Sequence, residues 1–272
     1  MDPAMRADDE LLIRDEQRLR IITLNRPERM NALTPDLHHR LQDAVMDAAR
    51  DPEVGALALT GAGRAFCSGG DVRRSSDDAA KASRPETVEE RADAVMAHGR
   101  TATMLHAMGK PTIALVNGAA AGSGMALALA CDIRILSSSA MMRTAYVGVG
   151  LSGDLGLSYF LRGLVGHAKA AELLFFNDKL DAATCLGLGL ANRIVAAEEF
   201  TEQALAFAAQ LAAGPTVAFR CIKQNLRAAA TETLEATIER EAYNTARCVR
   251  TRDVKEAALA FREKRPPLFE GK

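Results

Sequence analysis

The stretch NGAAAGSGMALALACD (residues 117–132) carries almost no reactive side chain, yet it sets the architecture around it. It follows an apolar run at 111–118, PTIALVNG, that is typical of a buried strand, and it leads into a second such run at 131–138, CDIRILSS. The small residues between the two runs predict a helix that begins near Ser123-Gly124. A strand, a helix and a further strand in this order indicate a parallel α/β unit with a right-handed crossover.

Earlier residues extend this pattern toward the N-terminus. The runs RLRIITLN (18–25) and GALALTGAG (55–63) predict two more buried strands. Between them, Thr34 followed by Pro35 predicts the start of a helix, because threonine is a good N-cap and proline suits the first helical position.

Helices separate the later strands and dominate the end of the chain. A helical pattern at about 86–108 follows a polar stretch at 73–86, RRSSDDAAKASRPE, which predicts a mobile loop. Beyond residue 198 the pattern is helical almost throughout. The expected helices span 199–212, 215–229, 231–249 and 252–263. We therefore predict an α/β core at 1–198 and a helical region at 199–272.

Composition and charge exclude several classes of protein. The 272 residues are 48% hydrophobic with a formal net charge of -1, so we expect a substantial core and no nucleic-acid partner, which would need a basic stripe. No apolar run reaches the roughly 18 residues of a membrane span, and the charged N-terminus lacks the apolar core of a signal peptide. The five cysteines form no CxxC pair and the five histidines no HExxH motif. This pattern predicts a reduced, cytoplasmic protein without a metal site.

Two glycine-rich stretches offer backbone amides rather than side chains. GRAFCSGGDV (63–72) leaves the backbone bare at Ser68-Gly69-Gly70, where a ligand can approach closely and successive N–H groups can bind an anion. The first turn of the predicted helix at Ser123 has free N–H groups and the positive end of the helix dipole. Each pattern also fits an ordinary turn or close helix packing.

A third stretch, YVGVGLSGDLGLSYFLRGLVG (146–166), contains one acid, Asp154, among glycines and apolar residues. An aspartate in such a setting most often caps a helix, here the helix that contains Phe160. Considered alone, Asp154 is therefore a structural residue as readily as a chemical one.

Taken in order, these motifs resemble the crotonase superfamily, also called the enoyl-CoA hydratase/isomerase family. The resemblance covers nearly the whole chain. It rests on NRPERMNAL (25–33), GRAFCSGGDV, KPTIALVNGAAAGSGMALALACDIRI (110–135), GLVGHAKAAELLF (163–175) and AALAFREKRPPLF (257–269). It implies a crotonase-like spiral of ββα units and a C-terminal helical region that forms homotrimers, often paired as hexamers.

The resemblance also implies an acyl-CoA site. Two backbone amides, at Ser68 and Ser123, are implied to bind the thioester oxygen, with coenzyme A present as part of the substrate and no separate cofactor. The residues implied to line this site are Arg29, Ala32, Ser68, Gly69, Gly70, Asp71, Ser123, Gly124 and Tyr146. Phe261 and Lys264 are implied to reach coenzyme A across a subunit boundary.

One departure from the family bears on the reaction. Typical hydratases of the family place two glutamates across the substrate double bond, and the matching positions here are Ala126 and Tyr146. Neither a methyl group nor a phenol, which ionises near pH 10, serves as a carboxylate base at neutral pH. Asp154 remains, at a position where relatives use an aspartate for chemistry, and burial would raise its pKa and make it a better base. The sequence therefore predicts an enoyl-CoA double-bond isomerase with Asp154 as acid and base.

Other functions stay open at this point. Decarboxylation, carbon–carbon cleavage, dehalogenation, hydration by unfamiliar groups, and non-catalytic acyl-CoA binding with Asp154 as a cap all fit the same motifs. A serine hydrolase is disfavoured, because Ser68 has no evident histidine partner. The histidines at 38, 39, 98 and 106 fall in two helices that are predicted to lie at the surface.

Overall fold

The computed structural model describes residues 9–71 and 84–272, and within them it contains two β-sheets. The six-stranded sheet has the order β1-β2-β3-β5-β7-β10, and β1 is antiparallel to a set of otherwise parallel strands. These strands span Leu11–Glu16, Leu19–Leu24, Ala56–Gly61, Thr112–Val116, Ile133–Ser137 and Arg193–Val195. The four-stranded sheet has the order β4-β6-β8-β9 and comprises Ala65–Cys67, Ala119–Ala121, Met141–Arg143 and Leu180–Asp181.

The chain passes from one sheet to the other and then into a helix, turn after turn. Strand β3 is followed by β4 and α3, β5 by β6 and α4, and β7 by β8 and α5. The helices of this part are α1 (Pro35–Arg50), α3 (Val88–Ala107), α4 (Ser123–Ala130), α5 (Leu157–Phe176), α6 (Ala182–Gly187) and α7 (Phe200–Ala212). Two 3-10 turns, Pro27–Arg29 and Tyr146–Val149, complete it. The predicted spiral of ββα units is thus confirmed.

Local sequence accounts for where the helices begin. The Thr34 hydroxyl accepts a hydrogen bond from the amide of Leu37, and Pro35 takes the first helical position of α1, as predicted. Helix α3 begins with a capping box between Thr87 and Glu90. Of the loop predicted at 73–86, residues 73–83 lie outside the described residues.

The short strands of the four-stranded sheet were not predicted from the sequence. The run at 111–118 forms β5 alone, and β6 follows it directly in the other sheet; β4, β6 and β8 have only three residues each. Three residues are too short to show a strand period, and three alanines have low strand propensity. Strand β1 was also missed.

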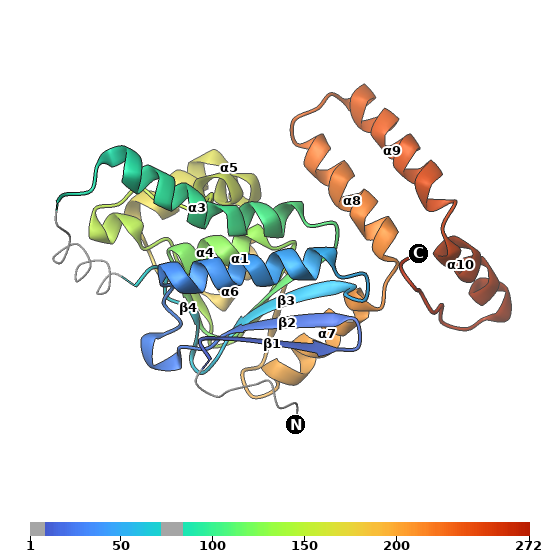
Figure 1. Cartoon of the computed structure of the whole chain (residues 1–272), viewed down its shortest axis with the longest axis horizontal. Helices are drawn as coiled ribbons and strands as arrows, with labels where there is room; N and C mark the ends of the chain where they lie inside the picture. Colours follow the sequence, from blue (N-terminus) through green and yellow to red (C-terminus); the bar gives the residue numbers. More distant parts are fainter. Residues whose placement is uncertain (1–8, 72–83) are drawn as a thin grey trace.

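Helix α7 belongs to the core of the spiral rather than to an appended helical region. Figure 1 shows it on the opposite side of the six-stranded sheet from α1, α3 and α4. Its residues Ala204, Phe207 and Leu211 pack with Leu19 and Ile21 in one cluster. These apolar residues therefore cover the protein's own sheet, and we propose that the core ends after Ala212 rather than at residue 198.

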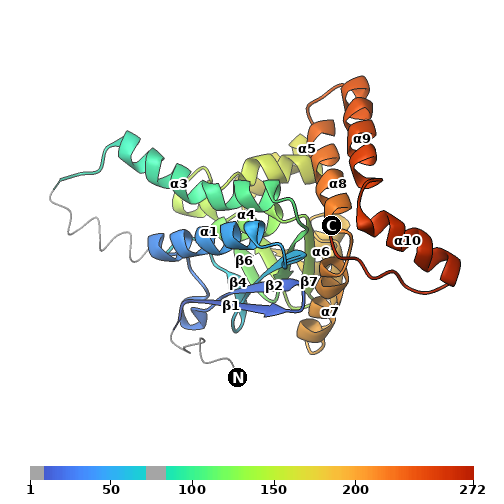
Figure 2. The ribbon, with the colours of Figure 1, turned by 45° about the vertical axis from the view of Figure 1, so that its right-hand side comes forward.

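The last three helices stand apart from the sheets. Helices α8 (Thr216–Ala229) and α9 (Leu234–Cys248) form a hairpin, and α10 (Arg252–Glu263) continues beyond it on the side away from α3 (Figures 1 and 2). On α9, Leu234 and Ile238 are 70% and 55% exposed, and on α10 Phe261 is 85% exposed. Large apolar side chains on projecting helices indicate surfaces that a partner can cover.

In the described part of the chain, no single helix has both the length and the apolar character to cross a membrane. Only α7 and α8 taken together reach that length and composition, and they are bent by 95° at their junction.

Candidate active site

The segment that follows β4 is fixed by backbone hydrogen bonds to the loop before α1. The amide of Ser68 donates to the carbonyl of Met30 over 3.0 Å, and the amide of Leu33 donates to the carbonyl of Gly69 over 2.8 Å. The amide of Asp71 then donates to the carbonyl of Leu33 over 2.9 Å. The glycine-rich segment is therefore rigidly paired rather than an open loop.

This pairing corrects one prediction. The Ser68 amide is already used by Met30, so it cannot also bind a thioester oxygen. Leu33 bonds to Gly69 and to Asp71, the residues on either side of Gly70. In a parallel pairing of this kind, the N–H of Gly70 points away from Leu33. Among the described residues, the Gly70 amide has no hydrogen-bond acceptor.

Helix α4 begins on the side of the Ser68–Asp71 segment that faces away from Leu33. Strand β4 pairs with β6 in parallel, with Cys67 opposite Ala120, so that the chain beyond each strand runs on side by side. A Cβ atom built on Gly69 would lie 3.1 Å from the Ala121 carbonyl oxygen and 3.6 Å from the Ser123 amide nitrogen. Ser123 is the first residue of α4, and its amide also lacks an acceptor in the part of the chain that the structure describes. Two free N–H groups, at Gly70 and Ser123, thus lie on adjacent segments.

Gly124 has a packing role. A Cβ atom at this position would lie 2.1 Å from the Cys67 carbonyl oxygen, so only glycine lets the start of α4 approach the end of β4. The Cys67 thiol beside it is fully enclosed, and burial raises its pKa to about 12. A thiolate nucleophile is therefore not available there at neutral pH.

Buried polar side chains hold the loop before α1 in place, and sequence reasoning did not identify them. Arg26 donates to the Ala32 carbonyl over 2.5 Å and forms ion pairs with Asp71 at 3.1 Å and Glu10 at 3.0 Å. Asn31 donates to the Ala65 carbonyl over 2.7 Å. Asp71 and Ala32, which were predicted to touch coenzyme A, thus also fasten this loop. Asn31 has a left-handed φ of 56°, a conformation that asparagine adopts more readily than most residues.

Asp154 does not cap a helix. Helix α5 has Gly156 at its N-cap with no side-chain hydrogen bond, and Asp154 contributes only its backbone carbonyl, to Leu157. The carboxylate oxygen Oδ1 instead accepts from the Ser123 hydroxyl over 3.1 Å and from the Tyr146 hydroxyl. The hydroxyls of Ser123 and Tyr146 are themselves 3.1 Å apart. The structure thus brings together Asp154, Tyr146 and Ser123, which were all predicted site residues.

Tyr146 is the donor in this arrangement. Burial, and next the negative charge of Asp154, raise the pKa of the Tyr146 phenol above its usual value. The phenol therefore stays protonated at neutral pH and its O–H points to the carboxylate. Its ring packs near Gly122 and Gly153, whose added Cβ atoms would each lie 3.7 Å from ring carbons.

The other position of interest, Ala126, lies inside the core. Its side chain is fully buried on α4 and presents only a methyl group. A cleft of about 500 Å³ is lined by Leu155 and Gly156, the two residues that follow Asp154 in the chain, and by residues of α3 such as Met96. The segment that follows Asp154 therefore borders a mostly apolar space of the size that small-molecule ligands occupy.

Three of the four histidines on α1 and α3 are less exposed than predicted, whereas His39 is exposed. His38 is only 5% exposed, and its ring stacks on that of His98 with centroids 4.2 Å apart. Burial, and next the charges of His98 and His39, lower the pKa of His38 to about 3. Burial also lowers the pKa of His98, while the charge of Asp154 acts in the other direction, which places His98 in the electrostatic environment of the site. The apolar positions 41, 45 and 48, in helical phase with residue 38, were the signal for a buried histidine.

Three residues that were predicted to bind coenzyme A have no contact with the group formed by Asp154, Tyr146 and Ser123 in the single chain. Arg29 is exposed on the 3-10 turn and makes no ion pair with the described residues. Phe261 and Lys264 lie at the end of α10, on the far side of the α8–α9 hairpin from α4 (Figure 2). In residues 9–71 and 84–272, no group of three His, Cys, Asp or Glu side chains is arranged to hold a metal ion.

Comparison with known proteins gives a consistent result. The family described as "Enoyl-CoA hydratase/isomerase" matches residues 14–272. A "Probable enoyl-CoA hydratase" of Rhodobacter capsulatus is 39% identical over 93% of this chain and 95% of its own length. A "1,2-epoxyphenylacetyl-CoA isomerase" of Escherichia coli is 34% identical over 94% of this chain and 97% of its own. The crystal structure of a putative enoyl-CoA hydratase from Streptomyces coelicolor covers 100% of both chains with a TM-score of 0.90 and 32% identity.

Proposed function

Because the chain belongs to the enoyl-CoA hydratase/isomerase family, and so to the acyl-CoA enzymes of the crotonase superfamily, we propose that it is an enoyl-CoA double-bond isomerase. The observation that carries this proposal is the position of Asp154. Its carboxylate accepts hydrogen bonds from the hydroxyls of Tyr146 and of Ser123, the residue whose amide begins α4. One carboxylate is sufficient for an isomerisation, whereas the family's hydration uses two.

Two free amides support the electrostatic part of the reaction. We propose that the N–H groups of Gly70 and Ser123 together bind the thioester oxygen of the substrate, in place of the pair Ser68 and Ser123. Both amides lack an acceptor among the described residues, and they lie on adjacent segments. Donors of this kind bind an enolate oxyanion more strongly than a neutral carbonyl, and one such donor typically contributes about 2.7–4 kcal/mol to lowering the barrier.

The proton transfer then follows from one acid–base group. The Asp154 carboxylate removes a proton from one carbon of the enoyl group, and the electron pair moves to the thioester oxygen, which the two amides stabilise. The resulting Asp154 carboxylic acid returns the proton to the carbon two positions along, and the double bond shifts. Substrate and product have the same mass. Tyr146 and Ser123 orient the carboxylate throughout.

Hydration is the second candidate, because the Rhodobacter capsulatus relative and others have names that include hydratase. It needs a group that activates water opposite the acid. The methyl group of Ala126 and the protonated phenol of Tyr146 do not supply one.

A panel of enoyl-CoA esters separates these functions. We expect a 3-enoyl-CoA to convert to its conjugated 2-enoyl isomer with no change in mass and with growth of the ultraviolet absorbance of the conjugated thioester. A product heavier by one water would instead establish hydration. Unchanged substrate across the panel, with esters that still bind, would identify a non-catalytic acyl-CoA-binding protein.

We further propose that the protein assembles as a homotrimer or a hexamer through α8, α9 and α10, whose exposed apolar residues include Leu234, Ile238 and Phe261. In this arrangement Phe261 and Lys264 reach coenzyme A bound to a neighbouring copy. Sedimentation should then report three or six times the 29.1 kDa chain mass. The double variant Phe261→Ala/Lys264→Ala should weaken acyl-CoA binding, whereas Phe176→Ala, at a comparably exposed ring on α5, should not. A monomer at micromolar concentration that binds acyl-CoA tightly would contradict both proposals.

A further inference from the structure

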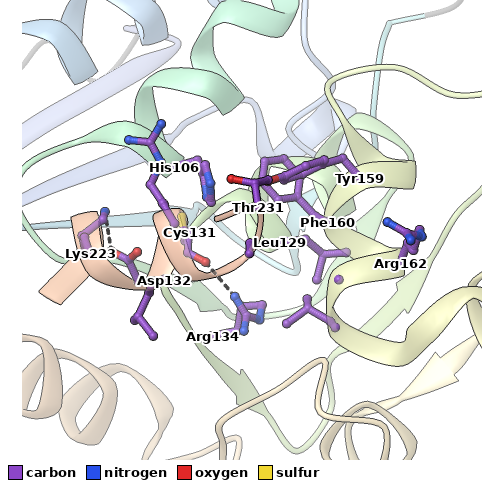
Figure 3. Close-up of a pocket in the computed structure, with 15 residues that line it drawn as sticks. His106, Leu129, Cys131, Asp132, Arg134, Tyr159, Phe160, Arg162, Lys223 and Thr231 are labelled. Atoms are coloured by element: carbon purple, nitrogen blue, oxygen red, sulfur yellow. Dashed lines mark hydrogen bonds and ion pairs between the residues drawn. The ribbon is translucent and has the colours of Figure 1, made fainter. Parts of the chain in front are cut away.

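The apolar cleft lined by Leu155 and Gly156 also has three aromatic side chains in its lining. This cleft, here called the proximal cavity, shares His106, Tyr159 and Phe160 with a second cavity of about 440 Å³, here called the distal cavity. The three side chains, here called the aromatic wall, line both spaces. Figure 3 shows them grouped at one side of the distal cavity, with the rings of Tyr159 and Phe160 next to His106.

Mutual ring contacts hold the wall together. The ring centroids of His106 and Phe160 are 5.4 Å apart at an interplanar angle of 63°, and those of Tyr159 and Phe160 are 5.4 Å apart at 86°. Edge-to-face geometry of this kind is favourable for aromatic pairs. A Cβ atom on Gly156 would lie 3.1 Å from a Phe160 ring carbon, so the ring also rests on the segment that follows Asp154.

The lining of the distal cavity includes apolar side chains that suit a hydrocarbon, together with two exposed arginines, Arg162 and Arg227. Leu129, Leu164 and Leu226 contribute to its lining. Its two buried cations are already bonded: Lys223 donates to Asp132 over 2.6 Å, and Arg134 donates to the Cys131 carbonyl over 2.7 Å. Figure 3 draws both interactions at the side of the cavity away from the wall. An apolar tail can therefore enter while Lys223 and Arg134 keep their hydrogen bonds.

We propose that the aromatic wall sets the acyl-chain length that the enzyme accepts. An acyl group that passes Asp154 enters the proximal cavity and stops at Phe160. Removal of the ring joins the two cavities and admits a longer chain. The inference rests on the proposed function, since it places the acyl group beside Asp154.

Saturated acyl-CoA esters test the wall without any chemistry, because they have no double bond to move. In the wild-type protein, affinity should rise by about fourfold for each methylene that is buried and then stop rising at the length that reaches the wall. In Phe160→Ala the rise should continue for several more carbons. Calorimetry with butyryl-, hexanoyl-, octanoyl-, decanoyl- and dodecanoyl-CoA measures both series.

Phe175→Ala is the matched control. Phe175 lies on the same helix, is 74% exposed and lines neither cavity, so this variant should keep the wild-type chain-length limit. Butyryl-CoA affinity within about twofold of wild type shows that Phe160→Ala is folded. If it does not fold, His106→Ala removes another part of the wall and should also extend the limit.

An unchanged limit in the folded wall variants, or an equal shift in Phe175→Ala, would overturn the proposal. The two proposals fail in different ways. If the limit moves as expected but no enoyl-CoA is isomerised, the wall is supported and the isomerase assignment is wrong. If isomerisation occurs but the limit does not move, the wall is wrong and the isomerase assignment stands.

Discussion

Asp154→Asn is expected to lower the rate of isomerisation by about 10²- to 10⁴-fold, the usual contribution of a single acid–base group. The amide keeps the shape of the carboxylate and can still accept from Ser123 and Tyr146, but it cannot take up a proton. Affinity for a saturated acyl-CoA should stay nearly unchanged, because the carboxylate acts on a carbon-bound proton rather than on coenzyme A. Single-turnover rates and calorimetric dissociation constants measure the two quantities separately.

Tyr146→Phe is the control for this substitution. It removes one donor to Asp154 and leaves the Ser123 hydroxyl in place, and the phenyl ring fits the same space beside Gly122 and Gly153. One neutral hydrogen bond contributes about 0.5–1.5 kcal/mol, so the rate should change by no more than about tenfold. If Asp154→Asn is as active as the wild type on the true substrate, Asp154 is not the base and the isomerase assignment fails.

Ser123→Pro should lower kcat by about 10²- to 10³-fold by removing a single N–H group. Ser123 is the first residue of α4, where proline is well tolerated, and its amide makes no hydrogen bond within the described residues. The substitution therefore deletes a proposed oxyanion donor with little effect on the helix. The decrease should appear in kcat rather than in KM, because the donor binds the enolate more strongly than the ground-state thioester.

Ser123→Ala separates the amide from the hydroxyl. Both substitutions remove the hydroxyl that donates to Asp154, but only proline removes the backbone donor. The expected result is a large gap in kcat between the alanine and proline variants, with similar melting temperatures. Equal kcat values in two folded variants would show that the Ser123 amide does not take part in the reaction.

The register of the proposed oxyanion donors shows what the sequence alone could not determine. Residues 68 to 71 are all small or polar, and any of their amides could point at a ligand. The choice is made by hydrogen bonds to Met30 and Leu33, some 38 residues earlier, which use the Ser68 amide and leave that of Gly70 free. Pairing between distant segments leaves no local periodicity, so residue 123, whose donor lies at a helix start, was predictable and residue 70 was not.

For other elements too, the sequence predicted features that depend on neighbouring residues and missed features that depend on contacts between distant segments. The start of α1 at Pro35 follows from Thr34 and its neighbours, and the helices of the C-terminal region follow from their own periodicity. The role of α7 depends on which surface its apolar face meets, and that surface is the six-stranded sheet, whose strands come from residues 11 to 195. The partners of Asp154 likewise come from elements eight and 31 positions away in sequence.

The unsatisfied amide of Ser123 means that stability and turnover are opposed at this position. Ser123 is 4% exposed, and a buried N–H group without an acceptor typically lowers stability by about 1–3 kcal/mol. A neighbouring side chain that accepted this hydrogen bond would make the empty protein harder to unfold, and it would also occupy the place that we propose for the thioester oxygen. Selection for thermostability alone would therefore tend to select against the reaction, and thermostable variants of this protein are best sought away from the start of α4.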